Sequence, residues 1–530
     1  MLPAHGRLDS GAAVFEVTIS ASALTRVSDY VTSHAARDPD AVALVHGDQR
    51  VSYRELSQQV DRLAAALLAA GVRKGDRVAT LSTPHPDFVV SFFAASSIGA
   101  IWLGLNPRYR LPELRHCVVD SGPKILLTHR QLQGRSCEPE IEALRASCES
   151  LERVVLLDDG PAEFLERGNS ITAQQLGQAR SVVESRDPCL LVYTSGSTGA
   201  PKGALLHHAG IIDFAILCNE LWPLAPHRVI NYFPINHIGN IVDCMMPCVV
   251  AGGMQVMLEQ FDPVVCLQLM ERERVTLWGS VPSVFQMQLA LPDFGRFDLS
   301  CVQLIAWGGA AMPRETIERL RAICPKLATN YGMTETSSAI TIVEPTDDVD
   351  VLANTVGRPR PGIEVRLSGE HGEIQVRSAG NFLGYWQQPD ATAAAFTDDG
   401  FFRTGDLGEL RPDGRIRLIG RLREMYKSGG YNVYPREVEA VIEAHPGVAS
   451  AAVVSIADPL WQEIGVAYVV PQASITTEQI EQYCRDRLAN YKLPKHIVLA
   501  ADLPLLPIGK VDKRLLRVWA EQSFTAWLKL

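Results

Sequence analysis

Apolar residues recur at helical spacing early in the chain. The stretch SYRE, Ser52–Glu55, has the form of a capping box, in which a Ser and a Glu together satisfy free amides where a helix begins. Apolar side chains then recur three or four positions apart, at Leu56, Val60, Leu63 and Leu67. Gly71 is typical of a residue that ends a helix. The pattern predicts an amphipathic helix between Ser52 and Gly71.

Short apolar runs alternate with further helical patterns as far as about residue 330. The runs DRVATLS, KILLT, RVVLL, CLLVYTS and VQLIAWGG are typical of buried strands. Their alternation with helices predicts a layered α/β domain with largely parallel sheets. The uncharged segment Phe88–Pro107 is long enough to span a bilayer, but its Ser, Gly, Asn and Pro residues favour a buried helix followed by a buried strand.

The pattern changes after about residue 350. IEVRL, GEIQVRS and RIRLIG are short alternating strand patterns separated by Gly and Pro turns, which predicts a β-rich subdomain. After GRLRE at 420–424, helical and strand patterns form a compact α+β unit. We therefore expect a large N-terminal domain, 1–420, of layered α/β subdomains plus the β-rich subdomain, and a small α+β C-terminal domain, 421–530.

Composition narrows the classes of function. The 530 residues carry a net charge of −10, which disfavours a broad nucleic-acid-binding face because such faces need clustered Lys and Arg. The 11 cysteines include no CxxC pair, which argues against a disulfide framework or a zinc knuckle and fits a cytoplasmic protein. Cys244 and Cys248 lie in an apolar run and are expected in the core. The first 30 residues show no signal peptide.

The segment YTSGSTGAPKG, Tyr193–Gly203, predicts an anion site. Small residues let the backbone wrap a phosphate closely, hydroxyl groups add donors, and Lys202 adds a positive charge. The segment directly follows a buried strand, which favours a ligand site over a flexible connector. Its spacing matches neither GxxxxGK[ST] nor GxGxxG, so it supports neither a P-loop kinase nor a Rossmann dehydrogenase.

The same segment resembles the signature loop of the adenylate-forming superfamily, which includes acyl-CoA synthetases. Further segments resemble that family's motifs in family order: NYGMTE (330–335), VGRPRPG, GEIQVRSAGNFLGYW, FFRTGDLG (401–408), GRLREMYKSGGYNVYPREVE (420–439) and YKLPKHIVLAADLPLLPIGKVDK (491–513). The resemblance covers nearly the whole chain after its first 25 or so residues. It implies an adenylation domain followed by a mobile C-terminal domain.

In this family a carboxylate attacks the α-phosphorus of ATP, pyrophosphate leaves, and a thiol then takes the acyl group from AMP. The resemblance implies that the β- and γ-phosphates lie against Thr194, Ser195, Gly196, Ser197, Thr198, Gly199 and Lys202. Glu335 is the expected ligand of Mg²⁺, a hard cation that binds carboxylate and phosphate oxygens. The ribose hydroxyls are expected at Asp406. Arg421 is expected to reinforce the ribose side, and a charge in a surface turn is the alternative.

The resemblance also implies an adenine site. Tyr331 is the expected platform for the ring, and the backbone of Gly309, Ala310 and Ala311 is expected on its other side. The nucleotide-binding segment then comprises Asn330, Tyr331, Gly332, Met333 and Thr334. Plain core packing would explain Tyr331 equally well.

Lys510, in LPIGKVDK, is the expected catalytic cation. By resemblance it reaches across the domain interface and offsets negative charge while the carboxylate attacks. The small domain then swings about a hinge at Arg423, a position where Asp or Lys is usual. The swing brings in the passage for the pantetheine arm of CoA, formed by Ser428, Gly429, Gly430 and Tyr431. Lys427 matches the Lys that relatives place near the site in this second state.

The expected acyl pocket is mostly apolar. Its candidates are His237, Ile238, Gly239, Trp307, Gly308 and Met312. His237, in FPINHIGN, matches a pocket-edge His that can act in catalysis, although a lone His beside apolar residues is equally explained by core packing. Gly239, or Asn240 if the alignment shifts by one, stands where amino-acid-activating relatives carry an Asp. Neither is a carboxylate, which disfavours an α-amino acid. We expect a medium-sized apolar or aromatic carboxylic acid.

The expected function is an ATP-dependent, AMP-forming acyl-CoA synthetase with ATP, Mg²⁺ and coenzyme A. One alternative is an acyl-AMP ligase that loads a carrier protein. Another is a non-catalytic nucleotide-binding relative, which is disfavoured because Lys202, Glu335, Asp406 and Lys510 are all present. No nucleic-acid partner and no transmembrane segment are expected. The resemblance alone suggests a homodimer.

Overall fold

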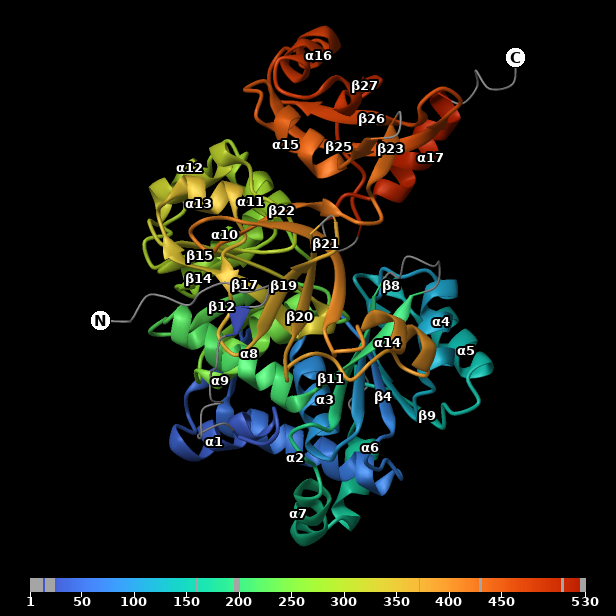
Figure 1. Ribbon diagram of the computed structural model, residues 1–530. Helices are drawn as coiled ribbons and strands as arrows, with labels where there is room; N and C mark the ends of the chain where they lie inside the picture. The colour runs from blue at the N-terminus through green and yellow to red at the C-terminus, as the bar shows by residue number, and fades with distance from the viewer. Residues whose placement is uncertain are drawn as a thin grey trace.

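The computed structural model describes residues 13–14, 24–158, 161–194, 201–370, 372–428, 431–506 and 510–524. Two α/β sheets and an antiparallel sheet make up a large body, and a smaller α+β body carries the C-terminal part of the chain (Figure 1). The α/β architecture predicted from alternating strand and helix patterns is confirmed.

One sheet, here called the N-terminal sheet, has the strand order β11-β10-β5-β4-β6-β9 in the described part of the chain. Its strands are β4 (Arg77–Leu81), β5 (Ile101–Leu105), β6 (Ile125–Thr128), β9 (Arg153–Leu156), β10 (Pro188–Thr194) and β11 (Lys202–His207). Strands β5, β4, β6 and β9 pair in parallel, and β11 returns antiparallel to β10. The β10–β11 connection is the predicted phosphate loop, whose residues 195–200 lie outside the described residues.

A second sheet, here called the central sheet, has the described order β18-β17-β16-β15-β14-β12-β13-β2-β3. Its strands are β2 (Val42–His46), β3 (Gln49–Ser52), β12 (Arg228–Asn231), β13 (Met254–Met257), β14 (Leu277–Ser280), β15 (Leu304–Trp307), β16 (Leu327–Met333), β17 (Ser338–Thr346) and β18 (Arg358–Pro359). The strands from β2 to β16 pair in parallel, so their carboxyl ends share one edge.

Apolar helices pack between and outside these sheets. Side chains of α2 (Tyr53–Ala69), α3 (Pro86–Ser97) and α8 (His208–Leu221) form one cluster with both sheets. The other face of the central sheet carries α10 (Pro263–Arg272), α11 (Pro282–Leu289), α12 (Arg314–Ile323) and α13 (Val349–Asn354). The outer face of the N-terminal sheet is covered by α4 (Leu111–Ser121) and α5 (Glu138–Ser147).

The remaining elements of the large body are short or peripheral. They are α1 (Asp29–Arg37), β7 (Gln131–Leu132), β8 (Arg135–Ser136), α6 (Ala162–Glu166), η1 (Arg167–Ser170), α7 (Ala173–Ser181), the π-helix η2 (Gly239–Met245), α9 (Met246–Val250), η3 (Phe294–Arg296), η4 (Thr334–Thr336) and α14 (Pro389–Ala395).

Two local predictions are confirmed. The hydroxyl of Ser52 accepts from the backbone N–H of Glu55, and the Glu55 carboxylate accepts from that of Ser52, which completes the capping box of α2. The uncharged segment Phe88–Pro107 folds as the rest of α3 and the buried strand β5. Among the described residues, no helix combines the length and apolarity needed to cross a bilayer.

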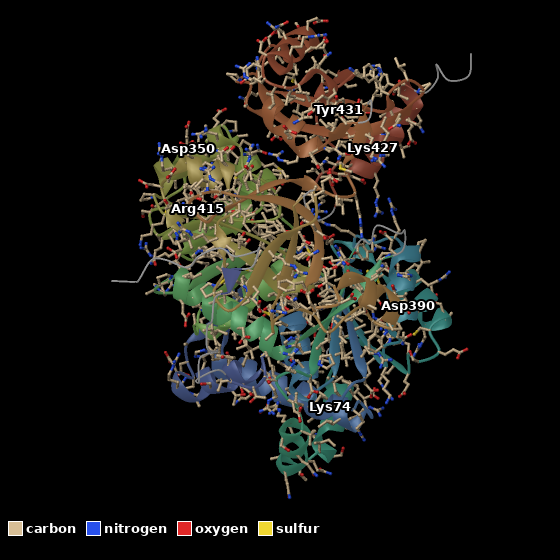
Figure 2. The ribbon with its side chains drawn as sticks, viewed as in Figure 1. Lys74, Asp350, Asp390, Arg415, Lys427 and Tyr431 are labelled. Carbon is tan, nitrogen blue, oxygen red and sulfur yellow. The ribbon has the colours of Figure 1, made fainter. Side chains whose placement is uncertain are left out.

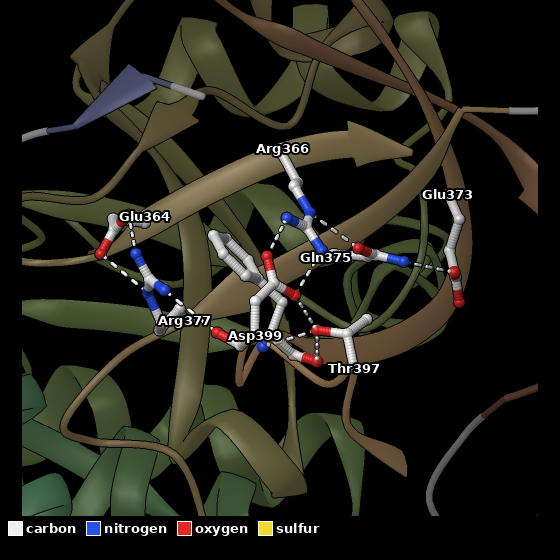
Figure 3. A network of polar contacts seen from close by, with 8 residues as sticks. Glu364, Arg366, Glu373, Gln375, Arg377, Thr397 and Asp399 are labelled. Atoms are coloured by element: carbon white, nitrogen blue, oxygen red, sulfur yellow. Dashed lines mark hydrogen bonds and ion pairs between the residues drawn. The ribbon is translucent and has the colours of Figure 1, made fainter. Parts of the chain in front are cut away.

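The β-rich part forms an antiparallel sheet of β1 (Ala13–Val14), β19 (Glu364–Ser368), β20 (Glu373–Arg377), β21 (Phe402–Leu410) and β22 (Ile416–Arg421). Figure 3 shows a polar network across its face. The Arg366 guanidinium donates to both oxygens of Asp399 at 2.5 and 3.0 Å and to Gln375 at 2.8 Å. Gln375 in turn donates to Glu373 at 2.9 Å. The network ties the segment before β21 to the sheet.

The small body holds its own sheet of β23 (Tyr426–Ser428), β24 (Tyr431–Val433), β25 (Val448–Asp458), β26 (Gln462–Pro471) and β27 (His496–Leu499). Its helices are α15 (Pro435–Glu443), α16 (Thr477–Arg485), η5 (Asn490–Lys492) and α17 (Lys513–Phe524). The chain leaves the large body at Arg421, where β22 ends, and enters this sheet at Tyr426. The boundary between residues 420 and 421 stays a prediction within this junction.

Candidate active site

The carboxyl ends of strands from both α/β sheets line one cavity of about 350 Å³. Its lining includes Ser82–Pro84 after β4, Asn106–Arg108 after β5, Tyr232–Ile235 after β12, Glu259 and Phe261 after β13, and Leu505 and Leu506 of the small body. Crevices at the carboxyl ends of parallel strands are the usual ligand sites of open α/β sheets. The volume lies in the range of small-molecule pockets.

The phosphate loop starts and ends on the antiparallel pair β10 and β11. Thr194 pairs with Lys202 across the two strands. The predicted residues Ser195, Gly196, Ser197, Thr198 and Gly199 lie outside the described residues. The Lys202 ammonium lies 5.2 Å from the centre of the Tyr385 ring, where it is attracted by the aromatic face.

Glu335 lies in η4, directly after β16, and Tyr385 fixes its carboxylate. The Tyr385 hydroxyl donates to Oε1 of Glu335 at 3.0 Å, and the backbone carbonyl of Glu335 accepts from Phe382 at 2.8 Å. Burial raises the pKa of Glu335, while the Tyr385 hydrogen bond and Arg421 oppose that rise. A partly buried carboxylate that shares the contact residue Tyr385 with Lys202 has the donor chemistry that Mg²⁺ takes.

Asp406, Tyr331 and Arg421 form a second polar group at the junction. The Tyr331 hydroxyl donates to Oδ2 of Asp406 at 2.8 Å, and Nε of Arg421 lies 2.9 Å from Oδ1. Asp406 is 4% exposed, so its charge is stabilised chiefly by these two partners. The nearby Asp406 carboxylate raises the pKa of Arg421. Arg421, which is expected to reinforce the ribose side, thus contacts Asp406 directly.

The polar network of Figure 3 continues towards Asp406. Oε1 of Glu373 accepts from the backbone N–H of Gly405 at 3.2 Å, and the Thr404 hydroxyl accepts from that of Asp406 at 3.0 Å. Thr404 also donates to the carbonyl of Ile374 at 2.6 Å. These bonds fix the backbone that carries Asp406 against β20.

Lys510 of the small body reaches the large body. It lies on a hairpin in which Leu505 bridges Val511 and the Leu506 N–H donates to the Lys510 carbonyl at 2.7 Å. A Cβ placed on Gly309 would lie 3.4 Å from Cε of Lys510, so the side chain runs along that glycine. Burial and the charge of Arg421 lower the pKa of Lys510, and the negative charges of Asp406 and Glu335 oppose that shift.

His237 also lies within electrostatic reach of Lys510. Burial, together with the Lys510 ammonium, lowers the pKa of His237 to about 4, so the ring is neutral at pH 7. Its Nδ1 accepts from the backbone N–H of Gly239 at 3.0 Å, which leaves Nε2 as the nitrogen that carries the proton. A neutral imidazole can donate one hydrogen bond to a ligand but adds no charge.

The predicted adenine edge is open. Gly309, Ala310 and Ala311 follow β15 and are exposed, while Tyr331 is buried at the end of β16. Asn330, Gly332, Met333 and Thr334 continue β16 into η4. Gly332 cannot carry a side chain, because a Cβ there would lie 1.8 Å from the Ser338 carbonyl.

The six residues predicted for the acyl pocket do not line the 350 Å³ cavity. Trp307 and Met312 are each 3% exposed and pack in the core of the central sheet. Ile238 and Gly239 are buried at the start of the π-helix, and Gly308 lies against the side-chain amide of Asn330. Their acyl-binding role stays a prediction.

The residues predicted for the thioester step lie elsewhere on the small body. Figure 2 labels Lys427 and Tyr431 on that body. Tyr431 is 59% exposed and stacks on Tyr491, with ring centres 4.5 Å apart. Ser428 pairs with Tyr431 and Gln462 within the small sheet. Gly429 and Gly430 lie outside the described residues. Lys510 therefore lies near Glu335 and Asp406, whereas the described residues predicted for the thioester step do not.

Arg423, the predicted hinge, lies in the junction between β22 and β23. The Leu422 N–H donates to the Gly405 carbonyl at 2.8 Å, and Lys513 of α17 pairs with Glu424 at 2.6 Å. The residues on either side of Arg423 are thus bonded to opposite bodies.

Two residues of this region were missed by sequence reasoning. Tyr385 lies in the motif GEIQVRSAGNFLGYW, which assigns it no role, although it contacts both Glu335 and Lys202. Asp243 lies in the π-helix that begins two residues after His237 and accepts a hydrogen bond from Ser338. Burial raises the pKa of Asp243 to about 6. A lone carboxylate in the mostly apolar run NIVDCMMP was the available signal.

Comparison with known proteins identifies the class. The model of the AMP-binding enzyme family matches residues 31–386, and that of the AMP-binding enzyme C-terminal domain matches residues 437–510. The chain therefore belongs to the AMP-binding enzyme family. It is 34% identical over 492 residues to a feruloyl-CoA synthase from an Amycolatopsis species, covering 90% of this chain and 96% of the relative.

A further relative and a solved structure are similar over nearly the whole chain. An indoleacetate–CoA ligase from Aromatoleum aromaticum is 32% identical over 506 residues, covering 92% of this chain and 96% of the relative. ATP-bound MatB from Rhodopseudomonas palustris superposes with a TM-score of 0.80 at 28% identity, covering 93% of this chain and 99% of MatB. Apo MatB from the same organism superposes with a lower TM-score of 0.73. The protein is thus an AMP-forming acyl-CoA ligase, and its described arrangement is closer to the ATP-bound form of that relative.

Proposed function

We propose that this arrangement is the state that makes the acyl-adenylate, with Lys510 as the catalytic cation. The observation that carries the proposal is the position of Lys510 along Gly309, within electrostatic reach of Glu335 and Asp406. The incoming carboxylate and the α-phosphate are both anions that repel each other as they approach. A fixed ammonium between them therefore stabilises the transition state more than the bound substrates. Glu335 would hold Mg²⁺, which supplies charge neutralisation on the leaving pyrophosphate.

The thioester step requires a second arrangement in this proposal. Ser428 pairs with Tyr431 within the small sheet, and the exposed Lys427 is held there by its backbone N–H, which donates to Glu463. Lys510 meanwhile lies along Gly309 of the large body. Rotation about the Arg423 junction would withdraw Lys510 and bring these residues in. One contact between the bodies is an exposed hydrogen bond, in which the Gln472 amide donates to Glu315 of α12 at 3.0 Å. Rotation of the small body would break it.

Adenylation should have an alkaline limit below the ordinary pKa of lysine. The Lys510 ammonium is the active form, so activity is complete below its lowered pKa and falls as pH rises through it. The quantity to measure is kcat/KM for ATP against pH, because it reports ionisations of the free enzyme. Lys510→Arg should remove the limb, since a guanidinium stays charged. An identical limb in that variant would assign the titration to another group.

We infer that the acid is aromatic and carries a hydrogen-bond donor. The names of two relatives, feruloyl-CoA synthase and indoleacetate–CoA ligase, support an aromatic acid. Asp243 supports a hydrogen-bond donor on the acid. It lies in the π-helix that follows His237, and it accepts a hydrogen bond from Ser338, which is three residues after Glu335. A partly buried carboxylate favours hydrogen bonds, and Ser338 supplies one. A donor on the substrate would supply another.

A panel of acids tests both parts of this proposal. Pyrophosphate release and thioester formation should be measured for hydroxylated and plain aromatic acids and for long-chain fatty acids, with and without CoA. Hydroxylated aromatic acids should give the highest kcat/KM. Asp243→Asn should reduce the preference for hydroxylated over plain aromatic acids several-fold. An unchanged preference would remove Asp243 from the acyl site, and the highest activity with long fatty acids would overturn the aromatic assignment.

The same measurements identify the thiol that accepts the acyl group. Turnover with free CoA favours the synthetase over an acyl-AMP ligase that needs a carrier protein. The homodimer and the cytoplasmic location stay predictions.

A further inference from the structure

Three potential metal ligands converge beside the cavity, outside the residues assigned to adenylation. His85, Asp87 and His129 each present one ligand atom, and these atoms lie within 4.8 Å of one another. His85 precedes α3, Asp87 lies in its first turn, and His129 follows β6. All three therefore lie at the carboxyl edge of the N-terminal sheet, next to the cavity-lining residues Thr83 and Pro84.

The distances fit a tetrahedral ion. Nδ1 of His85 lies 3.2 Å from Oδ2 of Asp87, and Nε2 of His129 lies 3.3 Å from the same oxygen. Ligand atoms about 2.0–2.1 Å from a tetrahedral Zn²⁺ are about 3.3 Å apart. Two of the three ligand–ligand distances therefore match the edges of such a site.

Hydrogen bonding alone does not account for these contacts. Nε2 of His129 is buried and has no hydrogen-bond partner of acceptable geometry, although Oδ2 of Asp87 is only 3.3 Å away. Nδ1 of His85 accepts from the backbone N–H of Asp87 at 3.2 Å, so in the neutral ring it carries no proton for the carboxylate. The Nδ1 lone pair of His85 and the unpartnered Nε2 of His129 thus both face one carboxylate oxygen, an arrangement that a bound cation would stabilise.

The surroundings supply compensating charge and a second layer of contacts. The His46 ring packs edge-on against His85 with centres 4.6 Å apart. Nε2 of His46 lies 3.1 Å from Glu259, which also accepts from the Thr83 hydroxyl at 2.6 Å. His46 and Glu259 come from the central sheet, so the group joins the carboxyl edges of both sheets. Glu259 therefore holds His46, and the His46 ring in turn packs against the candidate ligand His85.

We propose that His85, Asp87 and His129 bind a divalent transition ion of the Zn²⁺ class at the rim of the cavity. Two imidazoles and one carboxylate suit Zn²⁺ and its first-row neighbours better than Mg²⁺, which prefers oxygen ligands alone. Three protein ligands leave a fourth position open. Binding must displace the hydrogen bond from the Asp87 amide to His85, and it would tie the start of α3 to the end of β6.

The ion makes the site testable without any measurement of ligase activity. The full-length protein, freed of metal with a chelator, is titrated with Co²⁺ while its visible absorption is followed. We expect saturable one-to-one binding with the intense bands of a four-coordinate ion, displacement by Zn²⁺, and no displacement by millimolar Mg²⁺. His129→Gln should weaken binding at least about 10-fold, whereas His445→Gln, in the small body, should leave it unchanged.

Asp87→Asn gives a second test if His129→Gln folds poorly, as judged by circular dichroism. Zn²⁺ should also raise the midpoint of thermal unfolding in the wild type and not in either ligand variant, because only a folded site binds the ion. Weak octahedral spectra, or equal Co²⁺ affinity in wild type, His129→Gln and Asp87→Asn, would overturn the site. Neither result bears on adenylation, because no ATP or acid is present.

Discussion

Replacing Lys510 by Ala is expected to slow acyl-adenylate formation by on the order of 100- to 1000-fold, the usual effect of removing one preorganised group that stabilises transition-state charge. Thioester formation from supplied acyl-adenylate and CoA should persist at close to the wild-type rate. The reason is geometric. Lys510 lies along Gly309 near Glu335 in the described state, while the predicted pantetheine residues lie on another part of the small body.

Single-turnover kinetics separates the two steps of this experiment. Pyrophosphate release in the absence of CoA reports adenylation, and loss of chemically prepared acyl-adenylate in the presence of CoA reports the second step. Lys326→Ala, which removes an exposed ammonium from the large body, is the matched control and should leave both rates unchanged. Equal losses in both steps of Lys510→Ala would contradict a role confined to adenylation.

Replacing Asp406 by Ala is expected to raise KM for ATP by on the order of 100-fold. A charged acceptor contributes about 1.5–3 kcal/mol per hydrogen bond, and two ribose hydroxyls are expected to donate to this one. The change also leaves Arg421 and the Tyr331 hydroxyl without the carboxylate that they contact. KM for the carboxylic acid should change much less, since the acid does not touch the ribose site.

The matched control for this prediction lies on the same hairpin. Asp413 stands in the turn between β21 and β22, where it pairs with Arg415 at 2.8 Å. Asp413→Ala should leave KM for ATP unchanged. Steady-state kinetics with each substrate varied in turn gives both constants. An Asp406→Ala enzyme whose two KM values rise together would indicate a general disturbance of the junction instead of a lost ribose contact.

Much of the fold follows from local patterns in the sequence. The capping box at Ser52 and the apolar spacing after it define α2, because both the free amides and the buried face are determined within one helix. The antiparallel sheet follows from the alternating segments around residues 364–421. Motif resemblance assigns both Asp406 and Arg421 to the ribose side, and the two residues are register partners on β21 and β22.

Contacts between distant segments could not be derived in this way. Tyr385 lies 50 residues from Glu335, and only packing of the intervening sheet brings the phenol to the carboxylate. The group His85, Asp87 and His129 has no motif spacing, because its members meet through parallel pairing of β4 and β6. Sequence also leaves open which rotation of the small body a structure adopts, since both arrangements use the same residues.

The central claim is that the acid is activated as a mixed anhydride with AMP, and an isotope transfer tests it most directly. With both carboxylate oxygens of the acid labelled with ¹⁸O, the attacking oxygen becomes the bridge to the α-phosphorus. That oxygen leaves with AMP when the CoA thiol attacks the carbonyl carbon. Mass spectrometry should find one label in AMP and the other in the thioester carbonyl. Unlabelled AMP, or ADP and phosphate as products, would contradict the account.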